Sequence, residues 1–236
     1  MTSYKLIRLL TVVFILLCTS CTDTEQTYFP LTKGLKWQYD VALITRDGLS
    51  NQKYIFNSLG KGDFNGEPAY LRESIDGTIS YYSLGEEGTH YLGNFDTNSF
   101  PPVKNEYKKI ILPKDIAIGA TWEDKTITKL LQKTGPPQKT LFKIIAKVPL
   151  EVKVESLDET VIVPAGKFEN CLKVSMSGSV YKDAGNYVGL TVVSVKQSNW
   201  YAPGIGLVKM KRIETTERQA LDKGTLLVEL TNYNSG

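Results

Sequence analysis

The chain carries few side chains that could act as a nucleophile or a base. His90 is its only histidine, and Cys171 is the only cysteine outside the first 21 residues. A histidine can activate a cysteine thiol, and a nearby cation such as Lys173 can lower a thiol pKa. A working dyad also needs a group that orients the base, and the sequence assigns none. We therefore interpret His90 as an ordinary strand residue and Cys171 as a packed thiol.

Patterns that hold metals or cofactors are equally sparse. One histidine and one free cysteine are too few for a zinc site of the usual type. Residues 62–67 match a calcium-binding loop at three positions, but the later ligands and the closing glutamate are absent. The sequence therefore predicts no catalytic residue, no metal and no cofactor. Glu73, Asp76 and Glu86 keep a carboxylate-based hydrolase open as the least favoured alternative, since sequence does not give the separation of paired carboxylates.

Aromatic side chains are the remaining candidates for a site. Trp37, Trp122, Trp200 and Tyr201 lie in segments that we expect to be strands. On the concave face of a curved sheet, such residues can line a cavity for an apolar ligand. They can equally be ordinary core residues, because aromatic side chains pack well on pleated surfaces.

The first 21 residues have the pattern of a secretory signal. Lys5 and Arg8 precede an apolar run over 9–17, and the small residues Thr19 and Ser20 precede Cys21. The run is too short for a permanent membrane span, which needs about 20 apolar residues. This arrangement resembles the lipobox of bacterial lipoproteins, except that Cys18 stands where that family usually has leucine.

The resemblance implies that the chain is cut before Cys21, that the thiol receives a diacylglycerol and that the new amino group is acylated. An ordinary signal cut without lipid and an uncleaved anchor are the alternatives. Residue 22 is threonine and not the aspartate that acts as an inner-membrane retention signal in enteric bacteria. The resemblance thus implies a cell-envelope protein, held by the bilayer through acylated Cys21, and in the outer membrane if the host is Gram-negative.

Cleavage leaves 216 residues with 26 basic and 25 acidic side chains. This balance argues against a nucleic-acid-binding protein, which would carry a basic stripe. With Cys21 modified, Cys171 has no cysteine with which to form an intramolecular disulfide. We expect three parts: a signal peptide at 1–20, a lipidated N-terminus and tether at 21–30, and a single β-rich domain at 31–236. Within the tether, Tyr28 and Phe29 already mark the start of folded chain.

The rest of the chain has the pattern of successive strands. Residues 35–95 predict a five-stranded antiparallel meander, because apolar residues alternate and tight-turn pairs recur. Four such pairs are present: Asp47-Gly48, Asn65-Gly66, Asp76-Gly77 and Glu87-Gly88. Residues 96–108 are loop-like and are the best candidate for a hinge, although the sheet could continue past them.

Longer strands follow in the second half. Apolar residues occupy the even positions of 141–156, preceded by a hairpin whose first arm is 125–133. Further strands are expected near 172–180, 187–201, 206–217 and 224–233. So many antiparallel strands predict an all-β, strongly curved sheet that forms a half-barrel or an open barrel. A two-layer β-sandwich is the alternative.

Three segments together resemble a broad group of bacterial secreted proteins and lipoproteins. They are Gly119–Trp122, Val163–Val174 with its Val-Pro-Ala-Gly-x-Phe turn, and Trp200–Lys209 with Tyr-Ala-Pro-Gly-x-Gly-x-Val. The resemblance implies an architecture and no activity. The expected shape of the chain also resembles that of the curved-sheet carriers of the periplasm, the LolA- and LolB-like proteins.

Together these observations predict a non-enzymatic, membrane-anchored lipoprotein of the cell envelope. We expect its curved sheet to bind an apolar ligand or an envelope protein partner. A structural or assembly module of an envelope complex, which would pair through exposed sheet edges, is the main alternative.

Overall fold

The computed structural model describes residues 27–45, 48–96, 102–135, 140–185, 189–217 and 223–234. The predicted signal peptide, Cys21 and most of the predicted tether lie outside the described residues.

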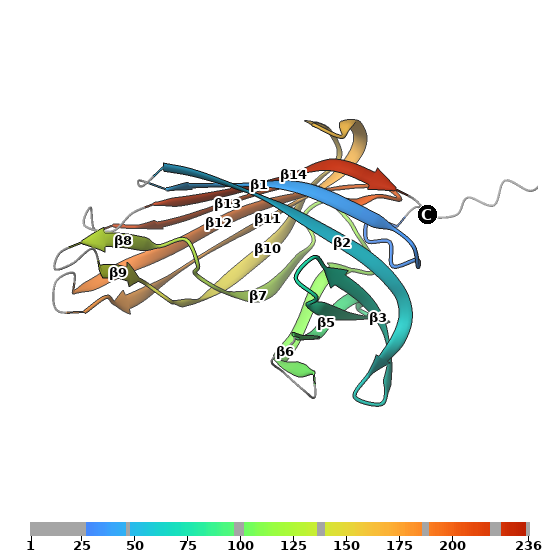
Figure 1. Cartoon of the computed structure of the whole chain (residues 1–236), viewed down its shortest axis with the longest axis horizontal. Coiled ribbons are helices and arrows are strands. Elements are labelled where there is room, and N and C mark those ends of the chain that lie inside the picture. Colours follow the sequence, from blue (N-terminus) through green and yellow to red (C-terminus); the bar gives the residue numbers. More distant parts are fainter. Residues whose placement is uncertain are drawn as a thin grey trace, which may run out of the picture.

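Within the described ranges the chain forms strands and no helix (Figure 1). The strands of the first half are β1 (Lys36–Thr45), β2 (Gly48–Phe64), β3 (Glu67–Ser74), β4 (Ile79–Gly85), β5 (Gly88–Phe95), β6 (Val103–Pro113) and β7 (Thr121–Ile127). Those of the second half are β8 (Gln132–Gly135), β9 (Thr140–Lys143), β10 (Lys147–Val163), β11 (Gly166–Asp183), β12 (Leu190–Ala202), β13 (Gly206–Thr216) and β14 (Gly224–Asn234).

Twelve of these strands form one antiparallel sheet in the order β6-β5-β4-β3-β2-β1-β14-β13-β12-β11-β10-β7, and β8 and β9 form a separate hairpin. The predicted meander is confirmed, since β1 to β5 pair in chain order. Asn65 and Gly66 turn the β2–β3 hairpin with φ of 55° and 90°, a conformation that asparagine and glycine tolerate best. The loop predicted at 96–108 is wrong for residues 103–108, which belong to β6, and the sheet continues there because β6 pairs with β5.

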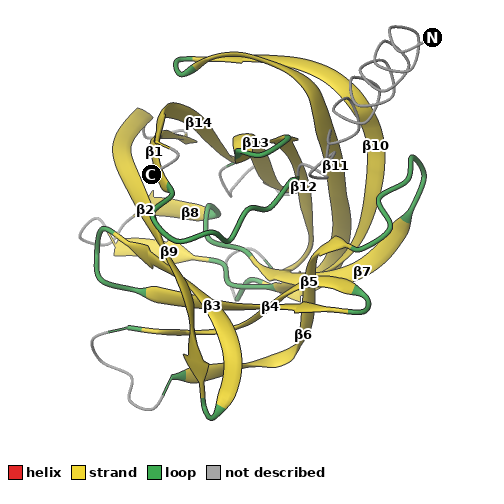
Figure 2. Cartoon of the chain, turned by 90° about the vertical axis from the view of Figure 1, so that its right-hand side faces the viewer, coloured by secondary structure: helices red, strands yellow, loops and turns green. Residues whose placement is uncertain are grey.

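The sheet curls into an open ring rather than splitting into a sandwich (Figure 2). Its two edge strands, β6 and β7, share no backbone ladder in the described chain, and side chains connect them instead. Lys109 Nζ lies 2.7 Å from a carboxylate oxygen of Asp124, and Trp122 Nε1 donates to the Ile110 carbonyl at 3.3 Å. The predicted open, strongly curved architecture is therefore confirmed.

Alternation along each strand fills the concave face. On β10, Val148, Leu150, Val152 and Val154 are all buried, while the residues between them, Pro149, Glu151 and Lys153, are exposed. Each such side chain contributes about 1.5–3 kcal/mol when it leaves water completely. The same period on β11 and β12 supplies Leu172, Val174, Val193 and Val195 to this core.

The predicted hairpin arms around residue 135 are shorter than expected. The arm at 125–133 is divided between β7 and β8, and the strand at 141–156 is divided between β9 and β10. Thr128 is the cause, because its hydroxyl donates to the Ile144 carbonyl and accepts from the Ala146 amide, each at 2.8 Å. A side chain that takes backbone partners in this way interrupts the ladder.

The tip of the β10–β11 hairpin bends across the end of the ring. Pairing shifts occur between Val154 and Ser156 and twice more before Val161, and such bulges increase twist and bend. Figure 2 shows β10 and β11 arching over the ring. At the tip, the Ala165 amide donates to the Leu230 carbonyl of β14 at 2.9 Å. The predicted Val163–Val174 motif thus closes one end of the core.

Candidate ligand-binding site

The segment at residues 27–35, here called the plug, fills one end of the ring. Phe29, Leu31 and Leu35 are 6–8% exposed. The Thr27 carbonyl accepts from the Gly204 amide at 3.0 Å, and the Leu31 carbonyl accepts from the Ser58 hydroxyl at 3.2 Å. The folded body therefore begins within the predicted 21–30 tether, as Tyr28 and Phe29 suggested.

Arg72 of β3 holds the plug from inside the ring. Its guanidinium carbon lies 3.9 Å from the ring centroid of Phe29 and 4.5 Å from that of Trp37, with Tyr82 at 5.6 Å. Nη2 donates to the Pro30 carbonyl at 2.6 Å. No carboxylate of the described residues pairs with Arg72, and burial lowers its pKa. The aromatic faces and one carbonyl stabilise this cation instead.

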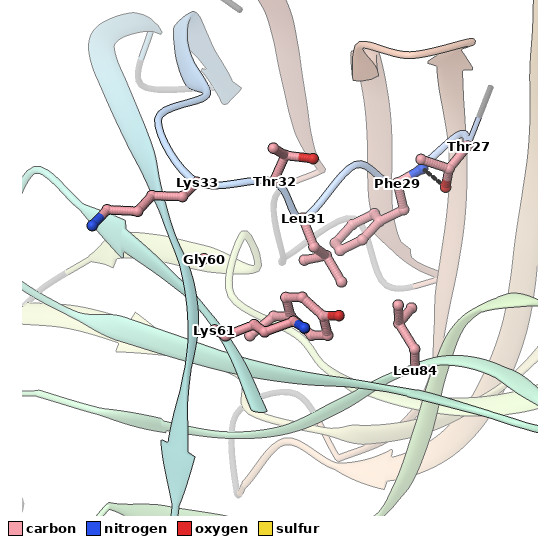
Figure 3. Close-up of a pocket in the computed structure, with 9 residues that line it drawn as sticks. Thr27, Phe29, Leu31, Thr32, Lys33, Gly60, Lys61 and Leu84 are labelled. Atoms are coloured by element: carbon pink, nitrogen blue, oxygen red, sulfur yellow. Dashed lines mark hydrogen bonds between the residues drawn. The ribbon is translucent and has the colours of Figure 1, made fainter. Parts of the chain in front are cut away.

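A cavity opens beside the plug, and we call it the tether-exit cavity (Figure 3). It has a volume of about 470 Å³. Its lining comprises Thr27, Phe29, Leu31, Thr32, Lys33, Gly60, Lys61, Tyr70 and Leu84. Figure 3 shows Lys61 reaching beneath Leu31 toward Leu84, whereas Lys33 extends outward from the rim. The lining therefore combines apolar walls with two lysines and includes no carboxylate.

A second cavity, the distal groove, lies where β1, β2, β13 and β14 face the end of β7. It has a volume of about 440 Å³. Its apolar lining comes from Val41, Leu43, Ile127, Leu130, Met210 and Leu226, and its polar lining from Ser50, Gln52, Tyr54, Thr126, Lys129, Gln197 and Arg212. Several of the apolar side chains, including Leu43, Met210 and Leu226, are only half-buried. The groove thus offers apolar surface that the described chain leaves open.

A buried ion pair forms one wall of the distal groove. Glu214 is fully buried and accepts from Arg212 Nη2 at 2.7 Å. It also accepts from the backbone amides of Lys129 at 3.0 Å and Leu130 at 2.8 Å. Arg212 makes further hydrogen bonds to Thr126, Gln197 and the Ile127 carbonyl. These contacts fix the segment after β7 against β13, so the wall is rigid and the Arg212 charge is compensated.

The structure does not gather the four predicted aromatic residues. Trp37 is 2% exposed and donates to the Ile205 carbonyl at 2.7 Å in the plugged end. Buried Tyr201 accepts from Asn199 at 2.9 Å, and burial raises its pKa to about 12. Trp122 lies at the β6–β7 seam. Trp200 is described below. None of these four aromatic residues lines the tether-exit cavity or the distal groove.

Trp200 belongs to a polar cluster away from the cavities. Its Nε1 donates to Glu159 Oε2 at 3.2 Å, and Lys173 Nζ lies 5.5 Å from its ring centroid. Lys173 also pairs with Glu159 at 2.8 Å. These mutual contacts satisfy the three side chains.

The candidate nucleophile and base are both buried. Cys171 is 0% exposed, and burial, followed by the charge of Glu159, raises its thiol pKa to about 11. His90 is 2% exposed, with Nε2 3.4 Å from a carboxylate oxygen of Glu87. Within the described ranges, no three histidine, cysteine or carboxylate side chains gather to hold a metal ion. Cys171 therefore packs as a neutral thiol.

The residues that line the distal groove were not singled out in the sequence. The alternation of β1 and β14 places Leu43 and Leu226 on the inner face, which was the one available signal. Nothing in the sequence shows that these strands pair with each other, or that the end of β7 comes to face them.

No protein-family model matches the chain, and no curated protein matches its sequence. Among solved structures, it is similar to a protein from Bacteroides fragilis NCTC 9343 that is described as exported and as having a YmcC-like fold. The two are 14% identical with a TM-score of 0.39, covering 88% of this chain and 98% of that one. It is also similar to a protein from Parabacteroides distasonis ATCC 8503 that is described as a lipoprotein. Here the identity is 14% and the TM-score 0.41, over 89% of this chain and 99% of that one.

The described residues contain no helix that is long and apolar enough to cross a membrane.

Proposed function

We propose that the chain is a membrane-anchored lipoprotein of the cell envelope that binds an apolar ligand, without catalysis, in the distal groove. The observation that carries the proposal is that one end of the concave face is filled and the other is open. The plug fills one end, while half-buried Leu43, Met210 and Leu226 line an open groove at the other.

The anchoring part of the proposal rests on the N-terminal sequence. A basic start, a short apolar run, Thr19 and Ser20 precede Cys21. Thr27 is bonded to the ring through its carbonyl, and five residues separate it from Cys21. If the host is Gram-negative, Thr22 favours the outer membrane.

The lining of the groove supports an apolar ligand with a small polar end. A volume of about 440 Å³ lies within the range of small-molecule sites. Burying apolar ligand surface on the groove floor is favourable by about 25 cal/mol per Å². Arg212 already pairs with Glu214, so an acidic ligand is not needed to neutralise it. Exposed Lys129 at the rim can accept the polar end of the ligand.

The groove is tested with the fluorescent fatty acid cis-parinaric acid and residues 22–236, which lack both the leader and Cys21 and therefore carry no acyl chains. We expect saturable binding that Leu226→Glu abolishes. Leu227→Glu is the matched control, because Leu227 is the next residue of β14 and faces the other side of the sheet. Binding that survives Leu226→Glu, or that both variants weaken equally, would contradict the proposal.

The anchor is tested separately by intact-mass analysis of the chain from its native membrane. We expect cleavage before Cys21 and the added mass of acyl chains, with both lost on Cys21→Ser. An unmodified mature N-terminus would refute anchoring and leave the groove result unaffected.

A further inference from the structure

We infer that the tether-exit cavity binds an anionic phospholipid of the bilayer in which the protein is anchored. The inference rests on the anchoring part of the proposed function and is independent of the distal groove. Three observations carry it: the position of the cavity on the chain, its apolar walls and the charge of its rim.

The position of the cavity follows from chain length. Thr27 lines the cavity, and Cys21 lies six residues earlier. Six residues, even if fully extended, span at most about 22 Å. A lipid attached at Cys21 therefore keeps the mouth of this cavity within reach of the headgroup layer. The distal groove lies at the other end of the concave face, so the lipid at Cys21 does not hold it near the headgroup layer.

The walls of the cavity suit an acyl chain. Phe29 and Leu31 present the inner side of the plug, and Leu84 of β4 faces them (Figure 3). Leu84 is 59% exposed, so its side chain offers apolar surface to the cavity. Covering it with an apolar chain removes that surface from water.

The rim of the cavity suits a phosphate. Lys61 extends into the cavity and Lys33 lies at its edge (Figure 3). Both lysines are exposed, and neither pairs with a carboxylate of the described residues. Lys61 can therefore give a phosphate a charge-assisted hydrogen bond without competition from a carboxylate of the lining, and Lys33 adds positive charge at the edge.

Gly60 allows the plug and β2 to shape this cavity. A Cβ atom at Gly60 would lie 2.8 Å from Lys33 Cβ, and its φ of +78° disfavours other residues. The backbone of β2 therefore lies directly against the plug at the point where Lys33 and Lys61 diverge.

The experiment titrates residues 22–236, which lack the leader and Cys21, with monomeric dihexanoyl phosphatidylglycerol and, separately, with dihexanoyl phosphatidylcholine, by isothermal titration calorimetry. Using the unlipidated chain makes the result independent of whether Cys21 is acylated in cells. We expect phosphatidylglycerol to bind about tenfold more tightly, since its net charge is negative, whereas the choline cation of phosphatidylcholine is repelled by the positive charge of Lys61 and Lys33. Glycerol phosphate alone should not compete at equal concentration.

The variants separate charge from apolar contact. Lys33→Ser with Lys61→Ser should reduce phosphatidylglycerol affinity to that of phosphatidylcholine. The matched control, Lys53→Ser with Lys211→Ser, removes two exposed lysines outside the cavity and should change nothing. Leu84→Ser should weaken both lipids about threefold, and its exposure makes misfolding a minor concern.

Three results would overturn the inference. They are equal affinity for the two lipids, phosphatidylglycerol binding that the cavity lysine variant leaves unchanged, and competition by glycerol phosphate as strong as that by the lipid. Leu226→Glu in the distal groove should leave phosphatidylglycerol binding intact, and a loss there would place the lipid in the groove instead.

Discussion

The two ends of the concave face differ in how the space inside the curled sheet is filled. A sheet of twelve strands curls around more space than its own inward side chains fill. At the tether end, the plug occupies that space with Phe29, Leu31 and Leu35. At the distal end, the segment after β7 covers part of it and leaves a groove with half-buried Leu43 and Met210. The two ends therefore differ in how completely the described chain fills them.

Each end also contains an arginine inside the ring, in opposite electrostatic settings. Arg212 at the open end pairs with fully buried Glu214. Arg72 at the plugged end lies between the rings of Phe29 and Trp37 and has no partner carboxylate in the described residues. A buried ion pair becomes costly when one member is removed, whereas a cation held by aromatic faces leaves no charge behind.

The largest effect is expected when the ion pair is broken. Arg212→Met should reduce the free energy of unfolding by about 3–5 kcal/mol, because Glu214 keeps two amide donors but loses its counter-charge. Arg72→Met should cost only about 1–2 kcal/mol, the value of a cation–π contact and one charged hydrogen bond less the relief of desolvation. Urea denaturation of both variants measures the difference. Equal losses of unfolding free energy in the two variants would contradict the electrostatic difference between the ends.

The next effect concerns the plug itself. Phe29→Ala should reduce the free energy of unfolding by about 3 kcal/mol, since Phe29 is 8% exposed and also contacts Arg72. Amide hydrogen exchange should then accelerate first in residues 27–35, because the plug loses its largest contact. If exchange accelerates uniformly over the sheet, the plug is an inseparable part of the core and not a filling for one end.

A pH effect is expected at the plugged end from Cys171. Its folded pKa is raised from 9.0 to about 11, so the folded state favours the neutral thiol. This contribution is complete below pH 9 and is lost as the pH rises from 9 to 11; it amounts to at most about 3 kcal/mol. Comparing wild type with Cys171→Ala cancels the tyrosines that titrate in the same range. A difference between the two chains that stays constant from pH 8 to pH 11 would contradict the buried setting of the thiol.

The smallest effect is expected in the groove. Leu43→Ala should reduce the free energy of unfolding by about 1 kcal/mol, because the side chain is half-buried and its loss opens no sealed cavity. The same change should weaken fatty-acid binding measurably. A cost near that of Phe29→Ala would mean that the groove is core, and the two ends would no longer differ in kind.

Local pattern was enough for much of the fold. The meander of β1 to β5 follows from alternating residues and from turn pairs such as Asn65-Gly66, whose backbone angles few other residues adopt. The inward face of β10 follows from its two-residue period. Thr128 was not foreseen as an interruption, because its effect depends on Ile144 and Ala146, which are far along the chain.

The candidate sites were predicted less well. Trp37, Trp122, Trp200 and Tyr201 were chosen for their residue type, yet the structure distributes them between the plugged end, the seam and the polar cluster with Glu159. Trp37 and Tyr201 are buried, Trp122 and Trp200 are partly buried, and the apolar lining of the open groove comes mainly from aliphatic residues and methionine, such as Leu43 and Met210. Residue type indicates what can pack and does not indicate which surface remains uncovered.

By itself, the amino-acid sequence determined the strand pattern and supported two predictions, a lipid anchor at Cys21 and no intramolecular disulfide at Cys171, because these depend on neighbouring residues and on composition. Only the tertiary structure decided that β1 lies beside β14, that the plug enters the ring and that a groove stays open. These features depend on how far the sheet curls, and curvature is the sum of twists and bulges along twelve strands. The curvature of the whole sheet cannot be read from any single segment, because it depends on all of its strands together.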